Sequence, residues 1–364
     1  MNKVFKILSS IPRFWLPTSL TLIAVGLPVT SFSQTVGVHT ILEVEGKVSV
    51  KKKQWKKPQP ASVGLTLSPD DMLYVAANAS FKVYCSNTTI WKVKPGKHTV
   101  SSGCPSENSV IRLPKSNNDT LRPAGKTESA LSKLPYLITP RETYILTNRP
   151  RLRWNAVPGI ANYTVKIDGV NWGTQTSSTE IVYPDEPPLQ EGRRYRITIE
   201  ANNGVSSLED AVVGFKVLDE QTKKTVLDTV KTVQKQQLSP EAKVLVLTRL
   251  YRGYKLYSDA IEGLKGLVNQ GSQVATVYQL LGDTYLEIGL PQLAKKPYEK
   301  ALKLATSTKD LSVQAGIQAG LGKTYRLLGN EGEAVQWLEK AKVGYGELGD
   351  GLQVQKLAHE IDSI

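Results

Sequence analysis

Residues 280–289 read LLGDTYLEIG, and residues 320–329 repeat that phrase closely as GLGKTYRLLG. A fainter copy, VLTRLYRGYK, occupies residues 246–255. Each copy carries a tyrosine followed nine residues later by an alanine, and these pairs are Tyr251 and Ala260, Tyr285 and Ala294, and Tyr325 and Ala334. Self-similarity at spacings of 34 and then 40 residues is typical of a chain built from stacked structural repeats.

Each copy predicts two amphipathic helices joined by a short turn. Apolar residues recur at helical spacing on both sides of Gly289 and Gly329, which mark the turn in two of the copies. The alanines stand where two helices must approach closely, and a large residue follows each alanine four positions later, at Leu264, Tyr298 and Leu338. A single helical pair cannot bury its apolar face, so the pattern predicts an all-α solenoid of stacked pairs over residues 220–364.

These residues resemble the tetratricopeptide repeat. The matching positions are Tyr278, Leu281, Gly282, Tyr285, Gly289, Ala294, Tyr298 and Ala301 in the middle copy, and Leu321, Gly322, Tyr325, Gly329, Ala334, Leu338 and Ala341 in the third. The first copy departs from the family at Thr248, where a glycine is expected. The resemblance implies repeats at about 241–274, 275–308 and 315–348, followed by a capping helix at 349–364.

Repeats of this family bind other proteins or peptides, so the resemblance implies a groove lined by the first helix of each pair. The positions that face such a groove are Arg249 and Arg252 in the first copy, Gln279, Asp283 and Glu287 in the second, and Lys323 and Arg326 in the third. Their order is basic, acidic, basic, which favours an extended peptide of mixed charge. The alternative is an ordinary solvated face.

Residues 34–112 are predicted to form an all-β domain. Runs such as HTILEVEGKVSV (39–50) and ASFKVYC (79–85) alternate apolar and polar residues at the period of a strand. The order of these phrases resembles the FecR-like periplasmic domain. Residues 113–134 are polar and contain two prolines, which predicts a linker.

Residues 135–219 are predicted to form a β-sandwich of short strands. The phrases WNAVPGIANYTVKI (154–167) and GRRYRITIEA (192–201) resemble a fibronectin type III or related immunoglobulin-like module. That resemblance implies Trp154 and Tyr195 as core residues. Trp172 is either a packing residue at a turn or a surface on which a carbohydrate stacks.

The first 33 residues have the parts of a secretory signal peptide. Lys3, Lys6 and Arg13 precede or border an uncharged run that extends from Phe14 to Phe32, and Ser33 follows it. We therefore expect export to the periplasm or outer cell surface, with cleavage near Ser33. The alternative is a retained anchor, since about 19 uncharged residues can just span a bilayer.

Export determines how the two cysteines are interpreted. Cys85 and Cys104 lie 19 positions apart in the strand-rich first domain. In an oxidising compartment such a pair is expected to form a disulfide. The alternative is two buried free thiols.

The chain carries a net charge of +13, and the excess is concentrated in residues 34–130. Its densest part is KKKQWKK, which consists of Lys51, Lys52, Lys53, Gln54, Trp55, Lys56 and Lys57. Lysines around an aromatic residue could meet an anionic polymer or lipid surface. The alternative is a solvated hairpin tip, and no nucleic-acid partner is expected.

Motifs for catalysis and cofactor binding are not found in the sequence. The three histidines, His39, His98 and His359, are far apart, and none lies near a cysteine or an acidic pair at metal-ligand spacing. The chain has no GxSxG, GxxxxGK or GxGxxG motif. We therefore expect no enzymatic activity, no metal and no cofactor.

Together these features predict two all-β domains followed by a tetratricopeptide solenoid, an order that resembles exported proteins of cyanobacterial type. The first functional hypothesis is an exported scaffold of the bacterial cell envelope that binds a protein partner through the groove. The second is an adhesion protein that binds an envelope glycan or anionic lipid through the basic first domain.

Overall fold

The computed structural model describes residues 38–105, 109, 132–184, 186–209 and 213–364. The predicted signal peptide and residues 113–131 of the predicted linker lie outside these ranges. Residues 35–364 form one compact unit. Within the described ranges, none of the helices has the length and apolar character that crossing a bilayer requires.

The first domain consists of two four-stranded antiparallel sheets, with strand orders β4-β1-β6-β7 and β3-β2-β5-β8. The strands are β1 (His39–Glu45), β2 (Val48–Lys51), β3 (Gln59–Pro60), β4 (Thr66–Leu67), β5 (Met72–Val75), β6 (Ser80–Tyr84), β7 (Ile90–Lys92) and β8 (Gly96–Thr99). Along β6, Phe81 and Val83 are buried while Ser80 and Lys82 are half-buried, as period-two alternation predicts. Residues from both sheets form one core, which includes Ile41, Val50, Leu73 and Phe81.

The second domain has a five-stranded sheet, β10-β16-β15-β12-β13, and a three-stranded sheet, β14-β11-β9. The strands are β9 (Leu137–Thr139), β10 (Thr143–Ile145), β11 (Arg151–Trp154), β12 (Tyr163–Asp168), β13 (Trp172–Thr176), β14 (Glu180–Val182), β15 (Arg194–Ala201) and β16 (Gly214–Val217). Trp154 and Tyr195 are buried in the common core, where the resemblance placed them. Trp172 lies in β13 and its ring packs edge-on against Tyr183 at 5.1 Å, so the structure gives this residue a packing contact.

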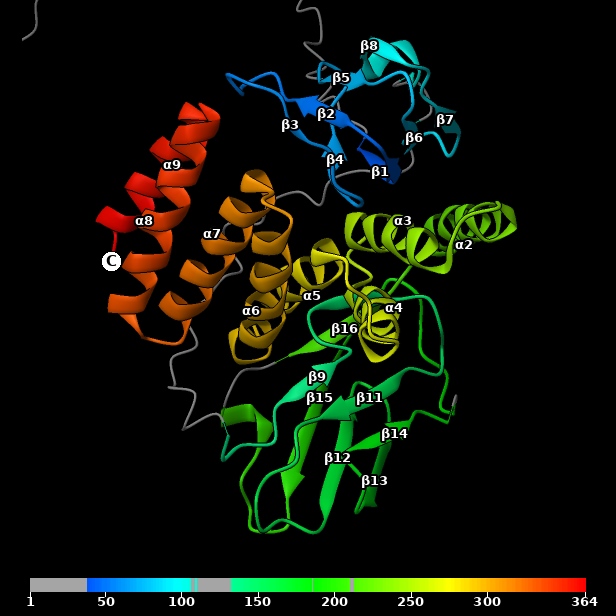
Figure 1. The fold of residues 1–364 in the computed structure, drawn as a ribbon. Coiled ribbons are helices and arrows are strands. Elements are labelled where there is room, and N and C mark those ends of the chain that lie inside the picture. Colours follow the sequence, from blue (N-terminus) through cyan, green and yellow to red (C-terminus); the bar gives the residue numbers. More distant parts are fainter. Residues whose placement is uncertain (1–37, 106–108, 110–131, 185, 210–212) are drawn as a thin grey trace, which may run out of the picture. The chain divides into compact units, whose positions relative to one another are not determined.

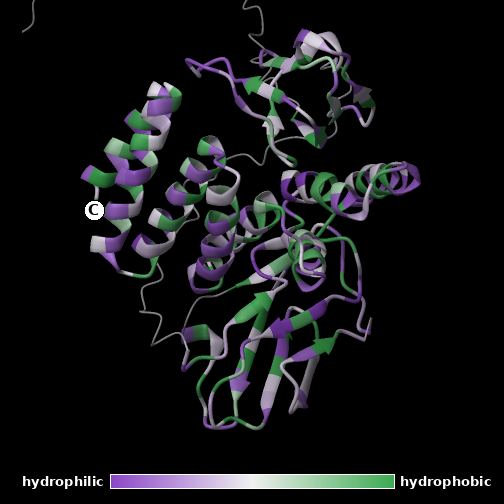
Figure 2. Ribbon diagram, viewed as in Figure 1, coloured by the Kyte–Doolittle hydropathy of each residue, from purple (hydrophilic) through white to green (hydrophobic). Residues whose placement is uncertain are grey.

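Helices make up the remainder of the chain, in the chain order shown in Figure 1. They are α2 (Glu220–Lys235), α3 (Pro240–Gly253), α4 (Tyr257–Asn269), α5 (Ala275–Glu287), α6 (Pro291–Ser307), α7 (Leu311–Leu327), α8 (Glu331–Leu348) and α9 (Gly351–Asp362). Figure 2 shows hydrophobic and hydrophilic residues mixed along each helix, as amphipathic helices require. Pairs α3–α4, α5–α6 and α7–α8 correspond to the three repeated phrases.

Local sequence signals explain where these helices begin and end. The Ser239 hydroxyl accepts a hydrogen bond from the Ala242 amide, and Pro240 occupies the first turn of α3. The turns that end α5 and α7 contain Gly289 and Gly329 with φ of 72° and 78°. This left-handed conformation favours glycine, so the repeated glycines allow the chain to reverse between paired helices.

Small residues allow the paired helices to approach each other. Ala294 of α6 and Ala334 of α8 are fully buried. Gly282 of α5 faces the ring of Tyr298 on α6, and a Cβ at Gly282 would lie 2.9 Å from that ring. The equivalent Gly322 of α7 faces Leu338 of α8 in the same way. The repeated phrase therefore encodes a contact between a small and a large residue in the α5–α6 and α7–α8 pairs.

Apolar contacts join the three domains within the compact unit. Leu42 and Tyr84 of the first domain belong to the same buried cluster as Val226 of α2 and Val246 of α3. Tyr136, which precedes β9, belongs to the core of the helical pairs. The β domains are thus packed onto the helices and do not merely precede them in the chain.

Candidate peptide-binding groove

The first helices of consecutive pairs are joined by charged side chains that the sequence placed in the groove. Arg252 of α3 donates two hydrogen bonds to the Glu287 carboxylate of α5, at 3.2 Å from Nε and 2.6 Å from Nη2. The Asp283 carboxylate lies 3.8 Å from Arg252 Nη1. Burial lowers the pKa of Arg252, but the charges of Glu287 and Asp283 outweigh burial and hold its pKa above the ordinary value. Arg252, Asp283 and Glu287 therefore form one ionic cluster.

Tyr298 extends this cluster into the core of the second pair. Its hydroxyl donates a 2.6 Å hydrogen bond to Asp283, and its ring is 1% exposed. Burial, followed by the Asp283 charge, raises the pKa of Tyr298 well above its usual range. The sequence identified Tyr298 as a repeat residue, but its polar role could not be seen because it depends on the geometry between α5 and α6.

The other predicted groove residues have different environments. Arg326 of α7 forms an ion pair with Glu360 of α9 at 3.4 Å, and Glu360 was not among the predicted residues. The Gln279 amide nitrogen lies 3.1 Å from the position that a Cβ at Gly316 would occupy, so α5 and α7 are close at that point. Lys323 is half-buried and makes no hydrogen bond or ion pair with the part of the chain that the structure describes. Among the predicted groove cations, Lys323 is therefore the one whose charged group has no hydrogen bond or ion pair with another described residue.

Arg249 faces the first domain. Its Nη2 donates a 3.1 Å hydrogen bond to the Gly64 carbonyl, across 185 residues of sequence. Burial and the neighbouring charge of Arg252 lower the pKa of Arg249 to about 10. Its buried Nε has no hydrogen-bond partner among the described residues. Arg249 is thus a less favourably placed cation than Arg252, one helical turn away.

The structure covers the aromatic residue of the basic cluster and leaves most of its lysines exposed, in the connection between β2 and β3. Trp55 is 4% exposed, and Lys51 and Lys52 are half-buried, whereas Lys53, Lys56 and Lys57 are exposed. Lys52 is influenced by the carboxylates of Asp71 and Asp350, and its ammonium lies 5.7 Å from the centre of the Trp55 ring. The aromatic residue that would have met a polymer is therefore covered.

The two cysteines are joined in a disulfide, with their Cα atoms 5.2 Å apart. The sequence placed no histidine near them, and the structure corrects that expectation. A ring nitrogen of His39 and the two sulfur atoms all lie within 4.8 Å of one another, because β1 pairs with β6 beside Cys85. The disulfide occupies both sulfur atoms, so we assign no metal to this group.

His39 predicts a pH dependence for the stability of the first domain. Burial lowers the pKa of His39 to about 4, and its Nδ1 accepts a 3.1 Å hydrogen bond from the Ser86 amide. Because the folded pKa lies below the unfolded value, the stabilising contribution is present above about pH 6.5 and is lost as the pH falls towards 4. We expect a loss of about 2 kcal/mol between pH 7 and pH 5.

Thermal unfolding of the His39→Asn variant over this pH range tests that expectation. The asparagine oxygen can still accept the Ser86 amide but does not titrate, so the variant should show a shallower pH dependence. Equal slopes for the variant and the wild type would contradict the assignment to His39.

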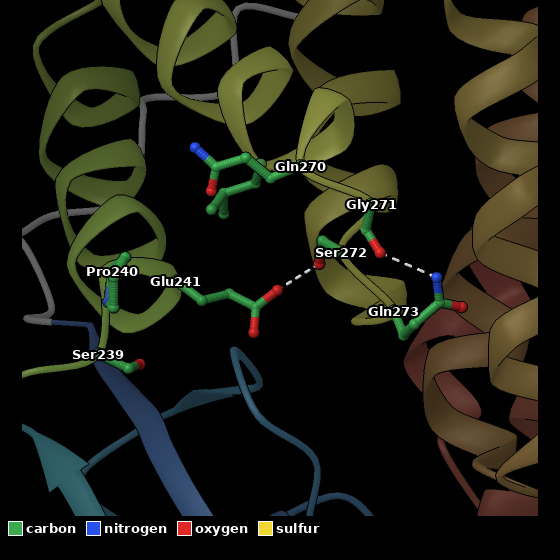
Figure 3. Close-up of a pocket in the computed structure, with 8 residues that line it drawn as sticks. Ser239, Pro240, Glu241, Gln270, Gly271, Ser272 and Gln273 are labelled. Carbon is green, nitrogen blue, oxygen red and sulfur yellow. Dashed lines mark hydrogen bonds between the residues drawn. The ribbon is translucent and has the colours of Figure 1, made fainter.

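A cavity of about 340 Å³ lies between the start of α3 and the α4–α5 turn (Figure 3). The Glu241 side chain points to Ser272 and accepts a hydrogen bond from its hydroxyl, while the Gln273 amide donates to the Gly271 carbonyl at 2.9 Å. The lining offers a single carboxylate, which Ser272 already engages. We assign no chemistry to this cavity.

The helical pairs of the C-terminal region define a helical-repeat architecture. Residues 275–308 and 315–342 match the family model described as tetratricopeptide repeat, so the C-terminal region contains repeats of this family. The match does not include the predicted first repeat, and the FecR-like and fibronectin type III resemblances of the β domains remain predictions. No curated protein matches the chain.

Several solved structures are similar to part of the chain. One is the crystal structure of BtubC (BKLC) from P. vanneervenii, with 14% sequence identity and a TM-score of 0.30. The match covers 39% of this chain and 72% of the BtubC chain. The crystal structure of MamA protein is 23% identical in sequence, with a TM-score of 0.28. This match covers 40% of this chain and 86% of the MamA chain. The crystal structure of TTC0263, a thermophilic TPR protein in Thermus thermophilus, is 18% identical in sequence, with a TM-score of 0.25. This match covers 39% of this chain and 84% of the TTC0263 chain.

Proposed function

We propose that this protein is an exported, non-enzymatic scaffold of the bacterial cell envelope that binds an extended peptide of a partner protein in the groove. The tetratricopeptide repeats support protein binding, because such repeats generally bind proteins or peptides. The observation that carries the proposal is the set of charged side chains on α3, α5 and α7. Within this set, Lys323 of α7 has no ion-pair partner among the described residues. The export component rests on the signal-like residues 1–33.

The ionic cluster favours a particular way of binding. Arg252 neutralises much of the Glu287 and Asp283 charge inside the protein, so we assign these side chains a positioning role and not direct contact with the peptide. Lys323 and the Gln279 amide remain available to hydrogen-bond a peptide backbone or a carboxylate. We do not propose binding of a glycan or an anionic lipid, because the Trp55 side chain is buried.

Affinity capture from an envelope extract tests the proposal with the full chain as bait. We compare the wild type with Lys323→Glu, which reverses the uncommitted groove charge, and with Lys303→Glu, which makes the same change at an exposed position of α6. A partner that is retained by wild type and by the Lys303 variant, but lost with the Lys323 variant, supports the groove. If all three baits captured the same set of proteins, the proposal of a peptide-binding groove at Lys323 would be wrong.

A further inference from the structure

A cavity of about 250 Å³ lies between α3 and α4, the two helices of the first pair. Residues three or four positions apart share one face of a helix, so each helix contributes a stripe of side chains to the wall. The lining includes Val244, Leu247, Thr248 and Tyr251 of α3, and Asp259 and Glu262 of α4. The volume is below that of a pocket for a drug-sized molecule and suits one side chain or a small ligand.

The cavity occurs where the first pair departs from the repeat pattern. The positions equivalent to Thr248 in the other two pairs are Gly282 and Gly322. Each of those glycines lies directly against a large side chain of the second helix of its own pair. The first pair therefore has a hydroxyl group at the place where the other pairs have a close contact between helices.

The Thr248 hydroxyl has no hydrogen-bond partner in the part of the chain that the structure describes, although the residue is only 1% exposed. Other threonines buried in helices behave differently. Thr229, Thr284 and Thr324 each donate to the carbonyl four residues earlier. A buried polar group that lines a cavity and lacks a partner in the chain is expected to bind a water or a ligand.

Two carboxylates line the same space. Asp259 and Glu262 form no ion pair with the described residues, and Arg151 of β11, which experiences the Glu262 charge, is paired with Glu180. Burial, and to a smaller extent the Glu262 charge, raises the pKa of Asp259 to about 6. Burial, followed by the Asp259 charge, raises the pKa of Tyr251 to about 12. The cavity is thus negatively charged at neutral pH and contains no compensating cation from the described chain.

An alkylammonium group complements this lining. An ammonium has three N–H donors and no acceptor, and the cavity offers the Thr248 hydroxyl and the carboxylates of Asp259 and Glu262 as acceptors. Bonds from an ammonium to carboxylates are charge-assisted. The methylene chain can pack against Leu247 and the Tyr251 ring. A neutral apolar ligand would leave the polar groups unpaired, which disfavours it.

We propose that the α3–α4 cavity binds the alkylammonium group of a primary amine, the chemistry shared by a lysine side chain of a partner protein and a free alkylamine. Thr248, Asp259 and Glu262 bind the ammonium, and the apolar wall binds the methylene chain. The site is separate from the groove at Lys323 and does not rest on the function proposed above.

Titration of the full chain with n-butylamine at about pH 7.5, followed by NMR, tests the proposal. Two comparison compounds are 1-butanol, which lacks the charge, and ammonium chloride, which lacks the alkyl chain. We expect butylamine to bind at least about tenfold more tightly than either. Equal binding of butylamine and butanol, or no binding of butylamine, would overturn the proposal and leave the cavity to water.

A lysine with both its amino and carboxyl termini capped distinguishes the two sources of the amine. Tighter binding of the capped lysine than of butylamine supports a protein side chain as the natural ligand, and weaker binding supports a free amine. The Lys323→Glu variant should bind butylamine as the wild type does, so this test and the groove test can fail independently.

Asp259→Asn should weaken butylamine binding about tenfold, because the ammonium loses a charge-assisted bond. The matched control is Glu333→Gln. Glu333 has the equivalent position in the first turn of α8, but it is exposed. Equal losses of affinity in the two variants would assign the effect to overall charge and count against the cavity.

Thr248→Val separates binding from folding. The variant should bind butylamine about fivefold more weakly. Its unfolding temperature should equal or exceed that of the wild type, because the hydroxyl it removes has no partner in the described chain. A lower unfolding temperature with unchanged butylamine binding would show that Thr248 only packs the pair.

Butylamine binding should also depend on pH. The Asp259 carboxylate is ionised above its pKa of about 6 and becomes protonated below it, so affinity should fall about tenfold between about pH 7.5 and about pH 5. Tyr251 and Arg151 do not change charge in this range. The Asp259→Asn variant should have a flatter profile, and an equally steep profile in that variant would contradict the role of Asp259.

Discussion

Replacing Arg252 by methionine should lower the free energy of unfolding by about 3 kcal/mol. The Arg252 side chain is 10% exposed, and its removal leaves Glu287 and Asp283 partly buried without their cation. The expected cost is at the lower end for a buried ion pair, because the two carboxylates keep roughly a quarter of their surface in water. Chemical denaturation of the full chain, monitored by circular dichroism, measures the effect.

Arg249→Met is the matched control for this prediction. The substitution is the same, and the residue lies one turn earlier in the same helix. Arg249 has its pKa lowered by burial, whereas Arg252 has its pKa raised by two carboxylates. Loss of a poorly compensated buried charge should be close to neutral, even though the bond to Gly64 is lost. Similar costs for the two variants would show that the ionic cluster is not what stabilises α3 against α5.

The pairing can be separated from general effects of burial by a double-mutant cycle. Glu287→Leu alone leaves Arg252 with Asp283 at 3.8 Å, which is a weaker contact than the bidentate bond to Glu287. The double variant Arg252→Met with Glu287→Leu should be less destabilised than the sum of the single variants, because neither partner is left behind. Additive effects would argue against a direct pair.

Tyr298→Ala should cost about 3–5 kcal/mol, because it removes the large residue on which two helical pairs converge. A Cβ at Gly282 of α5 would lie 2.9 Å from the Tyr298 ring, and one at Gly320 of α7 would lie 2.5 Å from it. The ring therefore fills the space between α5 and α7. Tyr298→Phe keeps the ring and loses only the bond to Asp283, so it should cost about 1 kcal/mol.

The same contact predicts the effect of a single added methyl group. Gly320→Ala should destabilise the protein by about 1–3 kcal/mol, because its Cβ would collide with the buried ring. Gly266→Ala, in the interior of α4, has nothing within 4 Å of the new Cβ and should stabilise the protein by up to about 1 kcal/mol through helix propensity. If both variants shifted the unfolding midpoint in the same direction, Tyr298 would not be the residue that holds these helices apart.

The helical pairs could be predicted because their signals are local. Ser239 and Pro240 start a helix through contacts within four residues, and Gly289 ends a pair through its own backbone conformation. The spacing from Tyr285 to Ala294 to Tyr298 repeats the small and large residues that face each other within one pair. Such patterns are written into adjacent residues and need no knowledge of the rest of the fold.

The environment of the groove charges could not be predicted in the same way. Groove-facing positions were carried over from the repeat family, but whether a charge meets a partner protein or another side chain depends on the angle between neighbouring pairs. Arg252 and Glu287 are 35 residues apart and meet because α3 packs beside α5. Lys323 occupies a similar place in its repeat and has no such partner among the described residues.

The residues alone were sufficient to establish the order of two β domains and a repeat solenoid, the turns and caps of the helices, and the small and large residues inside each pair. Hydrophobic period, capping and glycine conformation act over a few residues, so they can be recognised without coordinates. Tertiary structure alone decided that His39 lies beside the disulfide, that Arg249 bonds to Gly64, and that Trp55 is covered. These contacts join residues that are far apart in the chain, 185 positions in the case of Arg249 and Gly64. The first depends on how β1 pairs with β6, and the bond of Arg249 to Gly64 depends on how the first domain packs on the helices, which no local pattern encodes.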